Sequence, residues 1–437
     1  MIPELLSGGG APTLRACRTN KFKTAMLTVS TALPITKENA CLAPLMLSVL
    51  RRGTEKYPTI ADLNRRLDYL WGTGFSIRSS YKGNLQILSF SAEMVDGAYL
   101  PEVSEDLTMA VLELLEQILF HPILDASGLL SARYVESEKE LQRDAIRAAK
   151  NRPRSYAIGQ CKKILYEGDP CGFPLYGSES ETMAVTPSQL TDYWRRWREH
   201  FSPDCFYVGS EDPTLVQEKL AAVFGKHLTA EGQAERSIFV SHREGREILK
   251  SETLPVAQSQ LIVGLRSPEN LNRDGYYAAA VMNEMLGGSP ISKLFVNVRE
   301  KKSLCYSCSS SFYSFAGVLL VDCGIKRENR EAAEREIKKQ IRDLAEGRFS
   351  VEELEAAKKS LGNACRQMED SPGELEGSYY SRALAENGVT ADQTKERFYA
   401  VSREEIMAAA RDLSVDVIYF LEGTDDAQEE DDDGEEI

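Results

Sequence analysis

The segment Val185-Thr-Pro-Ser-Gln-Leu190 leads, later in the chain, to the short apolar run Cys205-Phe-Tyr-Val208. Threonine before proline predicts the start of a helix, because a hydroxyl at the N-cap accepts a backbone N–H and proline suits the first helical position. The apolar run is typical of a buried strand. Near the other end, Val401-Ser-Arg-Glu-Glu-Ile406 leads in the same way to Val417-Ile-Tyr-Phe420. One helix–strand pair therefore occurs twice.

The elements that precede each copy also follow one order. Both halves show strand-like alternation, then a helix pair, a hairpin and further helices. In the first half we expect these at about 21–30, 36–52 and 59–70, 74–94, and 103–166; in the second at about 247–265, 276–299, 305–325, and 330–368. A period of roughly 200 residues indicates a duplicated domain and not a solenoid. The sequence thus predicts an α+β fold of two tandem homologous domains, each an antiparallel-rich sheet packed with helices.

Composition sets the expected domain boundaries. We expect an N-terminal domain at 1–230, a polar linker at 231–243, a C-terminal domain at 244–424 and an acidic disordered tail at 425–437. Nine Asp and Glu residues and no Lys or Arg occupy that tail. Such a run of like charges is typical of a solvated, disordered segment.

Charge, hydropathy and cysteine content argue against several classes of protein: those that bind nucleic acid, span a membrane or are secreted. The 437 residues carry a net charge of −15, which argues against a protein that binds nucleic acid. We find no targeting sequence and no run of about 20 apolar residues. Nine scattered cysteines without a secretion signal predict reduced thiols and a cytoplasmic location. We interpret Cys305-Tyr-Ser-Cys308 as two ordinary strand cysteines, because we find no further ligands nearby.

Three motifs in the same order indicate a family. The run Leu42-Ala-Pro-Leu-Met-Leu-Ser-Val-Leu-Arg-Arg-Gly-Thr-Glu-Lys-Tyr-Pro58 resembles the zinc-helix region of insulinase-like (M16, pitrilysin-type) metallopeptidases. The resemblance continues through Pro170-Cys-Gly-Phe-Pro-Leu-Tyr-Gly177 and Val298-Arg-Glu-Lys-Lys-Ser-Leu-Cys-Tyr-Ser307, and covers about residues 15–422. It implies a half-clamshell of two similar domains, as in one subunit of these peptidases.

The zinc motif itself is missing. The family carries His-x-x-Glu-His on one helix, where two imidazoles bind zinc and the carboxylate activates water. Those three positions correspond to Pro44, Leu47 and Ser48, and the downstream glutamate ligand corresponds to Ala145, or to Asp144 with a slip of one residue. Proline and leucine have no donor atom, and a serine hydroxyl is a poor ligand for zinc. We therefore expect no metal in this chain. Because Pro44 disfavours a helix interior, the helix could begin there.

A second set of family residues is retained. Arg299 and Tyr306 match the arginine and tyrosine with which the family, by this resemblance, binds the peptide main chain and the oxyanion of the intermediate. Both side chains donate hydrogen bonds, as that role requires. Ser303, between them, stands where the family usually has glycine.

This combination matches the non-catalytic subunits of bacterial heterodimeric M16 peptidases. The resemblance implies a subunit that is inactive alone, pairs with a zinc-bearing M16 subunit and helps to bind unfolded peptide in a shared chamber. It implies no cofactor here, with zinc only in the partner, and no nucleic-acid or membrane partner. Two alternatives stay open: a structural homologue without a role in peptide processing, and a metallopeptidase with a displaced metal site that uses Cys305 and Cys308.

Overall fold

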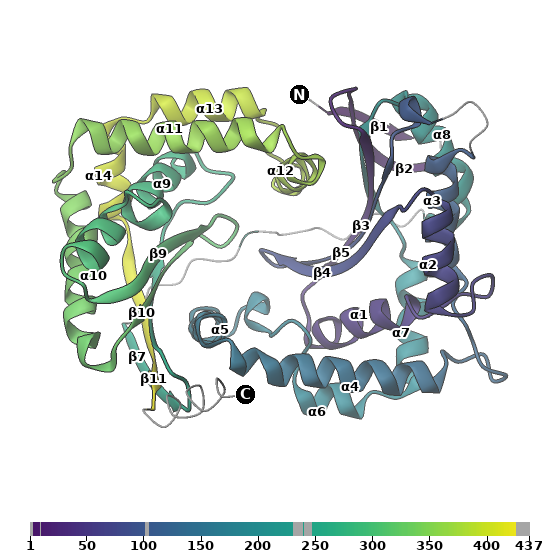
Figure 1. Cartoon of the computed structure of the whole chain (residues 1–437), viewed down its shortest axis with the longest axis horizontal. Coiled ribbons are helices and arrows are strands. Elements are labelled where there is room, and N and C mark those ends of the chain that lie inside the picture. Colours follow the sequence, from purple (N-terminus) through teal and green to yellow (C-terminus); the bar gives the residue numbers. More distant parts are fainter. Residues whose placement is uncertain (1–2, 9, 101–104, 230–238, 240–246, 425–437) are drawn as a thin grey trace, which may run out of the picture. The chain divides into compact units, whose positions relative to one another are not determined.

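The computed structural model describes residues 3–8, 10–100, 105–229, 239 and 247–424, and Figure 1 labels their helices and strands. In chain order the elements are β1 (Glu4–Gly8), β2 (Ala11–Arg18), β3 (Thr24–Pro34), α1 (Lys37–Leu50), α2 (Ile60–Tyr69), β4 (Gly74–Lys82), β5 (Leu85–Val95), α3 (Leu107–Phe120), α4 (Ala132–Ala148), α5 (Pro153–Leu165), α6 (Glu179–Ala184), α7 (Pro187–Glu199), β6 (Asp204–Gly209), α8 (Pro213–Phe224), β7 (Ile248–Leu254), β8 (Ser259–Arg266), α9 (Tyr276–Asn283), η5 (Glu284–Gly288), η6 (Phe295–Glu300), β9 (Cys305–Tyr313), β10 (Val318–Ile325), α10 (Arg330–Ala345), α11 (Val351–Met368), α12 (Pro372–Leu384), α13 (Ala391–Ala400), α14 (Arg403–Arg411) and β11 (Ser414–Gly423).

Two sheets repeat one topology. The first has the order β1-β2-β6-β3-β5-β4 and the second β7-β11-β8-β10-β9. Among the described strands, each sheet holds one parallel pair, β2–β6 in one and β7–β11 in the other, and otherwise pairs antiparallel. Apart from the added edge strand β1, every strand of one sheet has a counterpart in the other. The prediction of a duplicated α+β fold is confirmed.

Alternating side chains explain why these strands form. In β3, residues Leu27 and Val29 point into the first core cluster, together with Leu88 and Phe90 of the neighbouring strand β5. The register runs unbroken from Thr24 opposite Val95 to Pro34 opposite Leu85. Helix α1 belongs to the same cluster through its buried apolar residues, so the sheet holds this helix in place.

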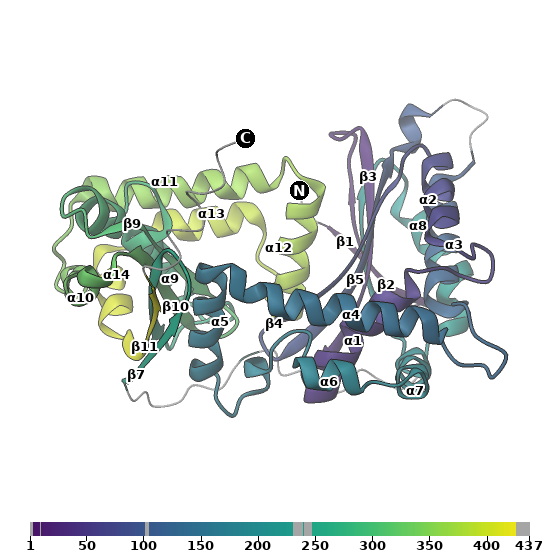
Figure 2. The same cartoon turned by 60° about the horizontal axis from the view of Figure 1, so that its bottom comes forward.

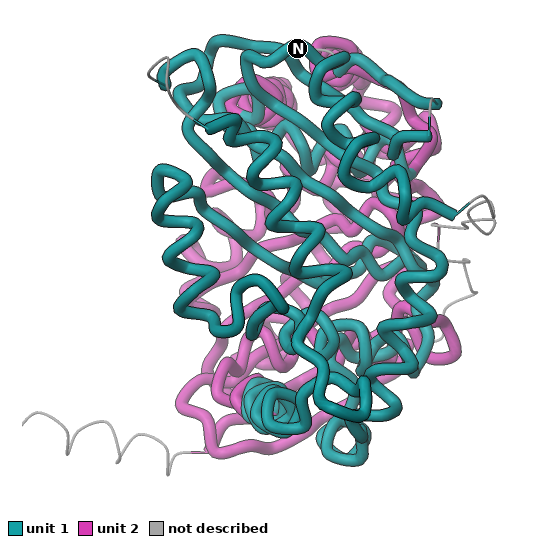
Figure 3. Tube along the Cα trace, turned by 90° about the vertical axis from the view of Figure 1, so that its right-hand side faces the viewer, with its two compact units in different colours: residues 1–146, 173–238, 368–384 teal, residues 147–172, 239–367, 385–437 magenta. Residues whose placement is uncertain are grey.

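The chain divides into two compact units that are interleaved in sequence. Unit 1 comprises residues 1–146, 173–238 and 368–384, and unit 2 comprises 147–172, 239–367 and 385–437 (Figure 3). Helix α5, from the first half of the chain, packs on β8 and β11 of the second sheet (Figure 2). Helix α12, from the second half, packs on β3 and β6 of the first sheet.

This exchange of helices alters the expected domain boundaries. The segments 1–230 and 244–424 each contribute one helix to the unit built mainly from the other. The apolar side chains of α5 fit the second sheet, where Cys161 and Leu165 join a cluster with Ile262 and Tyr419. The predicted tail, 425–437, lies outside the described residues, and so does the predicted linker, 231–243, apart from Phe239.

Strands β1 and β2 were not among the expected elements. The β2 segment Ala11–Arg18 is short and carries two arginines, which hides its alternation of buried and half-buried residues. Strand β2 pairs parallel with β6, just as β7 pairs parallel with β11, so β2 is the counterpart of β7 in the first sheet. No helix in the described part of the chain is both long and apolar enough to cross a bilayer.

Candidate functional site

Helix α1 carries the positions of the missing zinc motif. It begins at Lys37, because Thr36 forms its N-cap and accepts the N–H of Asn39 at 3.0 Å. Pro44 therefore lies well inside the helix, and the expectation that the helix begins at this proline is wrong. Pro44 has no N–H to donate to the carbonyl of Ala40, one turn earlier in the helix. That carbonyl instead accepts the N–H of Tyr176 at 3.0 Å. The helix thus keeps its length despite the proline.

The side chains at the zinc positions form an apolar surface. Pro44 and Leu47 are buried, Ser48 is half-buried, and Leu47 belongs to the first core cluster. Ala145 lies exposed on α4. Asp144, the neighbour that a one-residue slip would select, is also exposed and accepts a hydrogen bond from Arg143 at 2.8 Å. None of the four aligned positions offers a good zinc ligand.

A glutamine joins α4 to α1 in this region. Gln142 is buried, and its Nε2, with two N–H groups, lies within hydrogen-bonding distance of the carbonyl of Cys41 (3.3 Å), the carbonyl of Tyr176 (3.1 Å) and the hydroxyl of Thr182 (3.1 Å). An amide is neither a base nor a good ligand for zinc, so this contact is structural. Burial raises the pKa of the Cys41 thiol, which keeps it protonated and unreactive.

The histidines in the described part of the chain do not replace the missing ligands. His121 and His200 are the C-cap residues of α3 and α7. His121 and His227 both contact Oε1 of Glu116, at 3.1 and 3.0 Å. Lys226 contacts the same oxygen at 3.0 Å and supplies a positive charge where a metal ion would have to bind. This cluster is therefore an ion-pair network.

Arg299 and Tyr306 lie in unit 2, on consecutive segments that pack together. Arg299 is near the end of the π-helical segment η6, and Tyr306 is in strand β9. The guanidinium lies over the ring of Phe295 at 4.6 Å, contacts Glu300 at 3.3 Å and is 40% exposed. The side chain of Tyr306 is 57% exposed. Both donors are therefore accessible to a ligand.

The turn between them adopts a conformation that favours glycine. Ser303 has φ of +50°, in the left-handed region. Its N–H bonds to the carbonyl of Arg299 at 3.0 Å, and the next N–H, of Leu304, bonds to Val298 at 3.1 Å. The glycine of the family pattern thus has a conformational reason, and the serine here tolerates the same turn.

Strand β9 contains a bulge at Tyr306. Ser307 pairs with Gly324 of β10, but Cys305 pairs with Ile325, so Tyr306 is an extra residue. In a regular strand, residues three apart point to opposite faces. The extra residue shifts the alternation of side chains by one position, so Cys305 points to the same face of the strand as Cys308.

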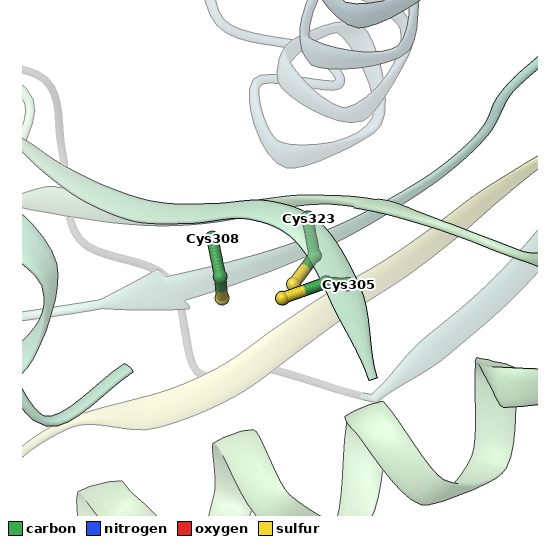
Figure 4. Close-up of side chains that lie close together, drawn as sticks. All are labelled: Cys305, Cys308 and Cys323. Atoms are coloured by element: carbon green, nitrogen blue, oxygen red, sulfur yellow. The ribbon is translucent and has the colours of Figure 1, made fainter. Parts of the chain in front are cut away.

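A third cysteine completes this face. Cys323 of β10 pairs directly with Cys308, and the sulfur atoms of Cys305, Cys308 and Cys323 all lie within 4.8 Å of one another (Figure 4). Cys305 and Cys308 both lie in strand β9, as predicted, but the expectation that no further potential ligand lies nearby is wrong, because Cys323 joins them. If β9 and β10 are paired residue by residue outward from the turn at 314–317, Cys308 lies opposite Cys323. This register could have been inferred from the sequence and would have indicated the third cysteine.

The fold and the altered helix α1 define a class: a duplicated metallopeptidase-like protein whose zinc-binding positions lack metal ligands. Residues 184–361 match the sequence profile of a family described as Peptidase M16 inactive domain. The chain is 29% identical to "Probable inactive metalloprotease YmfF" of Bacillus subtilis (strain 168), over 98% of this chain and 99% of that protein. The chain is thus similar, over almost its whole length, to inactive members of the M16 peptidase family.

Solved structures share the whole fold. A conserved protein from Enterococcus faecalis V583 aligns with a TM-score of 0.87 and 27% identity, covering 96% of this chain and 99% of that one. A structure described as a peptidase M16 inactive domain, from Pseudomonas fluorescens, aligns with a TM-score of 0.81 over 97% of this chain and 99% of that one. Its identity of 18% supports the fold alone.

Proposed function

We propose that this chain is the non-catalytic subunit of a heterodimeric zinc peptidase. It pairs with an M16 subunit that carries His-x-x-Glu-His and helps to bind unfolded peptide in a chamber that the two subunits share. The observation that carries the proposal is an asymmetry between the two units. The zinc positions of α1, Pro44, Leu47 and Ser48, lack a good metal ligand and are mostly buried. Arg299 and Tyr306 remain accessible.

The retained pair gives this chain its part in the chemistry. The guanidinium of Arg299 and the hydroxyl of Tyr306 donate to the main-chain oxygen of a bound peptide and to the negative charge that develops on it during hydrolysis. Losing one such donor commonly costs about 3 kcal/mol of transition-state stabilisation. Zinc and the general base come from the partner, so this chain alone hydrolyses no peptide.

The state of the cysteines agrees with a reducing compartment. All nine are free thiols. We place the heterodimer in the cytoplasm on this ground, since reduced cysteines are the rule there.

Co-purification tests the pairing. The chain is co-expressed with a His-x-x-Glu-His-bearing M16 protein from the same genome, and hydrolysis of fluorescein-labelled, reduced and carboxymethylated lactalbumin is followed. We expect a stable complex, turnover by the complex, and none by this chain alone. The absence of a complex with every such protein of that genome would overturn the pairing.

Peptide binding separates this function from a purely structural role. The labelled lactalbumin is titrated with the complex, in which the partner's catalytic glutamate is replaced by glutamine to stop turnover. We expect fluorescence anisotropy to rise, and the rise to weaken when Arg299 and Tyr306 are both substituted. Equal binding by the substituted complex would favour the structural alternative.

A further inference from the structure

The geometry points to a binding site for a thiophilic metal ion formed by Cys305, Cys308 and Cys323. The proposed occupant is a soft d¹⁰ cation held by three thiolates. This site lies in unit 2 and is separate from the degenerate zinc positions on α1. It does not depend on the proposed pairing with another subunit.

The spacing of the three sulfur atoms suits one central ion. Metal–sulfur bonds of about 2.3 Å in a trigonal arrangement place the sulfurs about 4 Å apart. All three sulfurs of the trio lie within 4.8 Å of one another. Closing the trio around an ion therefore needs only small side-chain movements.

The backbone holds the three cysteines in place before any ion binds. Cys308 and Cys323 are buried and directly paired across β9 and β10. The bulge at Tyr306 brings Cys305 to the same side of the strand pair, as Figure 4 shows. Bulges commonly re-aim a side chain next to functional sites. In a regular strand, Tyr306 would occupy the face that Cys305 now shares with Cys308.

Exposure favours the loading of an ion. Cys305 is partly exposed, so an ion can reach the site from solvent, whereas Cys308 and Cys323 are buried. A thiolate is the form that binds metal.

The donor set favours a soft cation. Thiolates select Cu(I) and Zn(II) over magnesium, calcium and manganese, which prefer oxygen. Structural zinc usually takes four protein ligands. In the described part of the chain, no fourth Cys, His, Asp or Glu joins the trio. We therefore expect Cu(I) to bind more tightly than Zn(II), which would need a water as its fourth ligand.

The test uses the full-length protein, reduced and desalted without oxygen. Cu(I), supplied as its bicinchoninate complex, should transfer to the protein at one ion per chain. X-ray absorption of that sample should show three sulfur neighbours at about 2.3 Å. In a parallel arm, Zn(II) is titrated against 4-(2-pyridylazo)resorcinol. Binding of one Zn(II) that depends on Cys305 would also support the site and would identify zinc as an occupant.

Two matched variants decide the outcome. Cys305→Ser removes a partly exposed ligand with little disturbance of the core, and we expect a loss of affinity of about 100-fold. Cys365→Ser, on α11 and outside the trio, should bind like the wild type. Circular dichroism checks that both variants fold. The proposal is overturned if neither cation binds at one per chain, if Cys305→Ser binds as tightly as the wild type, or if fewer than three sulfurs surround the copper.

Discussion

The backbone N–H of Tyr176 donates a hydrogen bond of 3.0 Å to the carbonyl oxygen of Ala40, the oxygen that Pro44 leaves without a helical donor. An unpaired buried carbonyl costs about 1–3 kcal/mol, so this bond offsets most of the damage that proline does inside a helix. A loop residue thus preserves α1 after the zinc motif has been replaced. The fold of the peptidase family survives here without the metal ligands.

Hydrogen exchange tests this bond. We expect the amide of Tyr176 to exchange slowly although it lies in a loop, because its acceptor belongs to a buried helix. The amide of Ser180, in the first turn of α6, should exchange faster, since first-turn amides have no acceptor within the helix. Mass spectrometry with fragmentation at residue level resolves the two sites. Equal exchange at both would contradict the role of this bond.

A second prediction concerns the turn between Arg299 and Tyr306. Ser303→Gly should raise the free energy of unfolding by about 0.5–1 kcal/mol, because glycine relieves the left-handed backbone strain while its freedom in the unfolded chain offsets part of the gain. Urea denaturation measures the change. Ser303→Ala, the control, retains a β-carbon and should bring no gain. A destabilised glycine variant would show that the serine side chain supports the turn.

The sequence predicts the positions of helices and strands better than it predicts which of them pack together. Alternation and capping residues located α1, β3 and the repeated order, because these signals are local. Which sheet α5 or α12 would cover could not be predicted, since an amphipathic helix shows that it has an apolar face but not which sheet that face meets.

The candidate sites show the same limit. Arg299 and Tyr306 were found through a local motif. The cysteine trio depends on one extra residue at Tyr306, and a bulge arises from the pairing of two strands. In a regular strand, side chains alternate between the two faces, so Cys305 and Cys308 would lie on opposite faces. Only the register with β10 shows that they lie on the same face.

A third prediction concerns acid stability. Burial alone would raise the pKa of Glu116, but hydrogen bonds from Lys226, His227 and His121 outweigh it and lower the pKa to about 2, from 4.5 in the unfolded chain. Since the folded pKa is depressed, the stabilisation is fully present above pH 4.5 and is lost as the pH falls toward 2. Relative to Glu116→Gln, the wild type should lose about 1 kcal/mol of stability between pH 6 and pH 3.5, after allowance for solvent screening.

Urea denaturation of both proteins at the two pH values measures this loss. Carboxylates elsewhere contribute equally to both proteins, so the difference between them reports Glu116 together with the two histidines that contact it. A difference that stays constant with pH would show that Glu116 is not held as a carboxylate by its three partners.

The last prediction concerns the proposed peptide-binding pair. In a heterodimer reconstituted with a zinc-bearing M16 subunit, Arg299→Ala or Tyr306→Phe should lower kcat/KM by about 10- to 1,000-fold, the range expected for the loss of a transition-state donor. Arg299→Lys keeps the charge but loses the planar fork, so its loss should be smaller. Both residues are accessible, and we therefore expect the substitutions to leave folding and subunit assembly intact.

Two matched substitutions in the same unit control for general effects. Arg335→Ala lies on the exposed face of α10, and Tyr399→Phe removes a partly exposed phenol on α13. Both should leave kcat/KM unchanged, because neither residue belongs to the η6–β9 region. Thermal melts and gel filtration confirm that each variant assembles. If Arg299→Ala and Tyr306→Phe turn over substrate like these controls, the chain contributes only shape to the heterodimer, and the structural alternative then explains its retention of the fold.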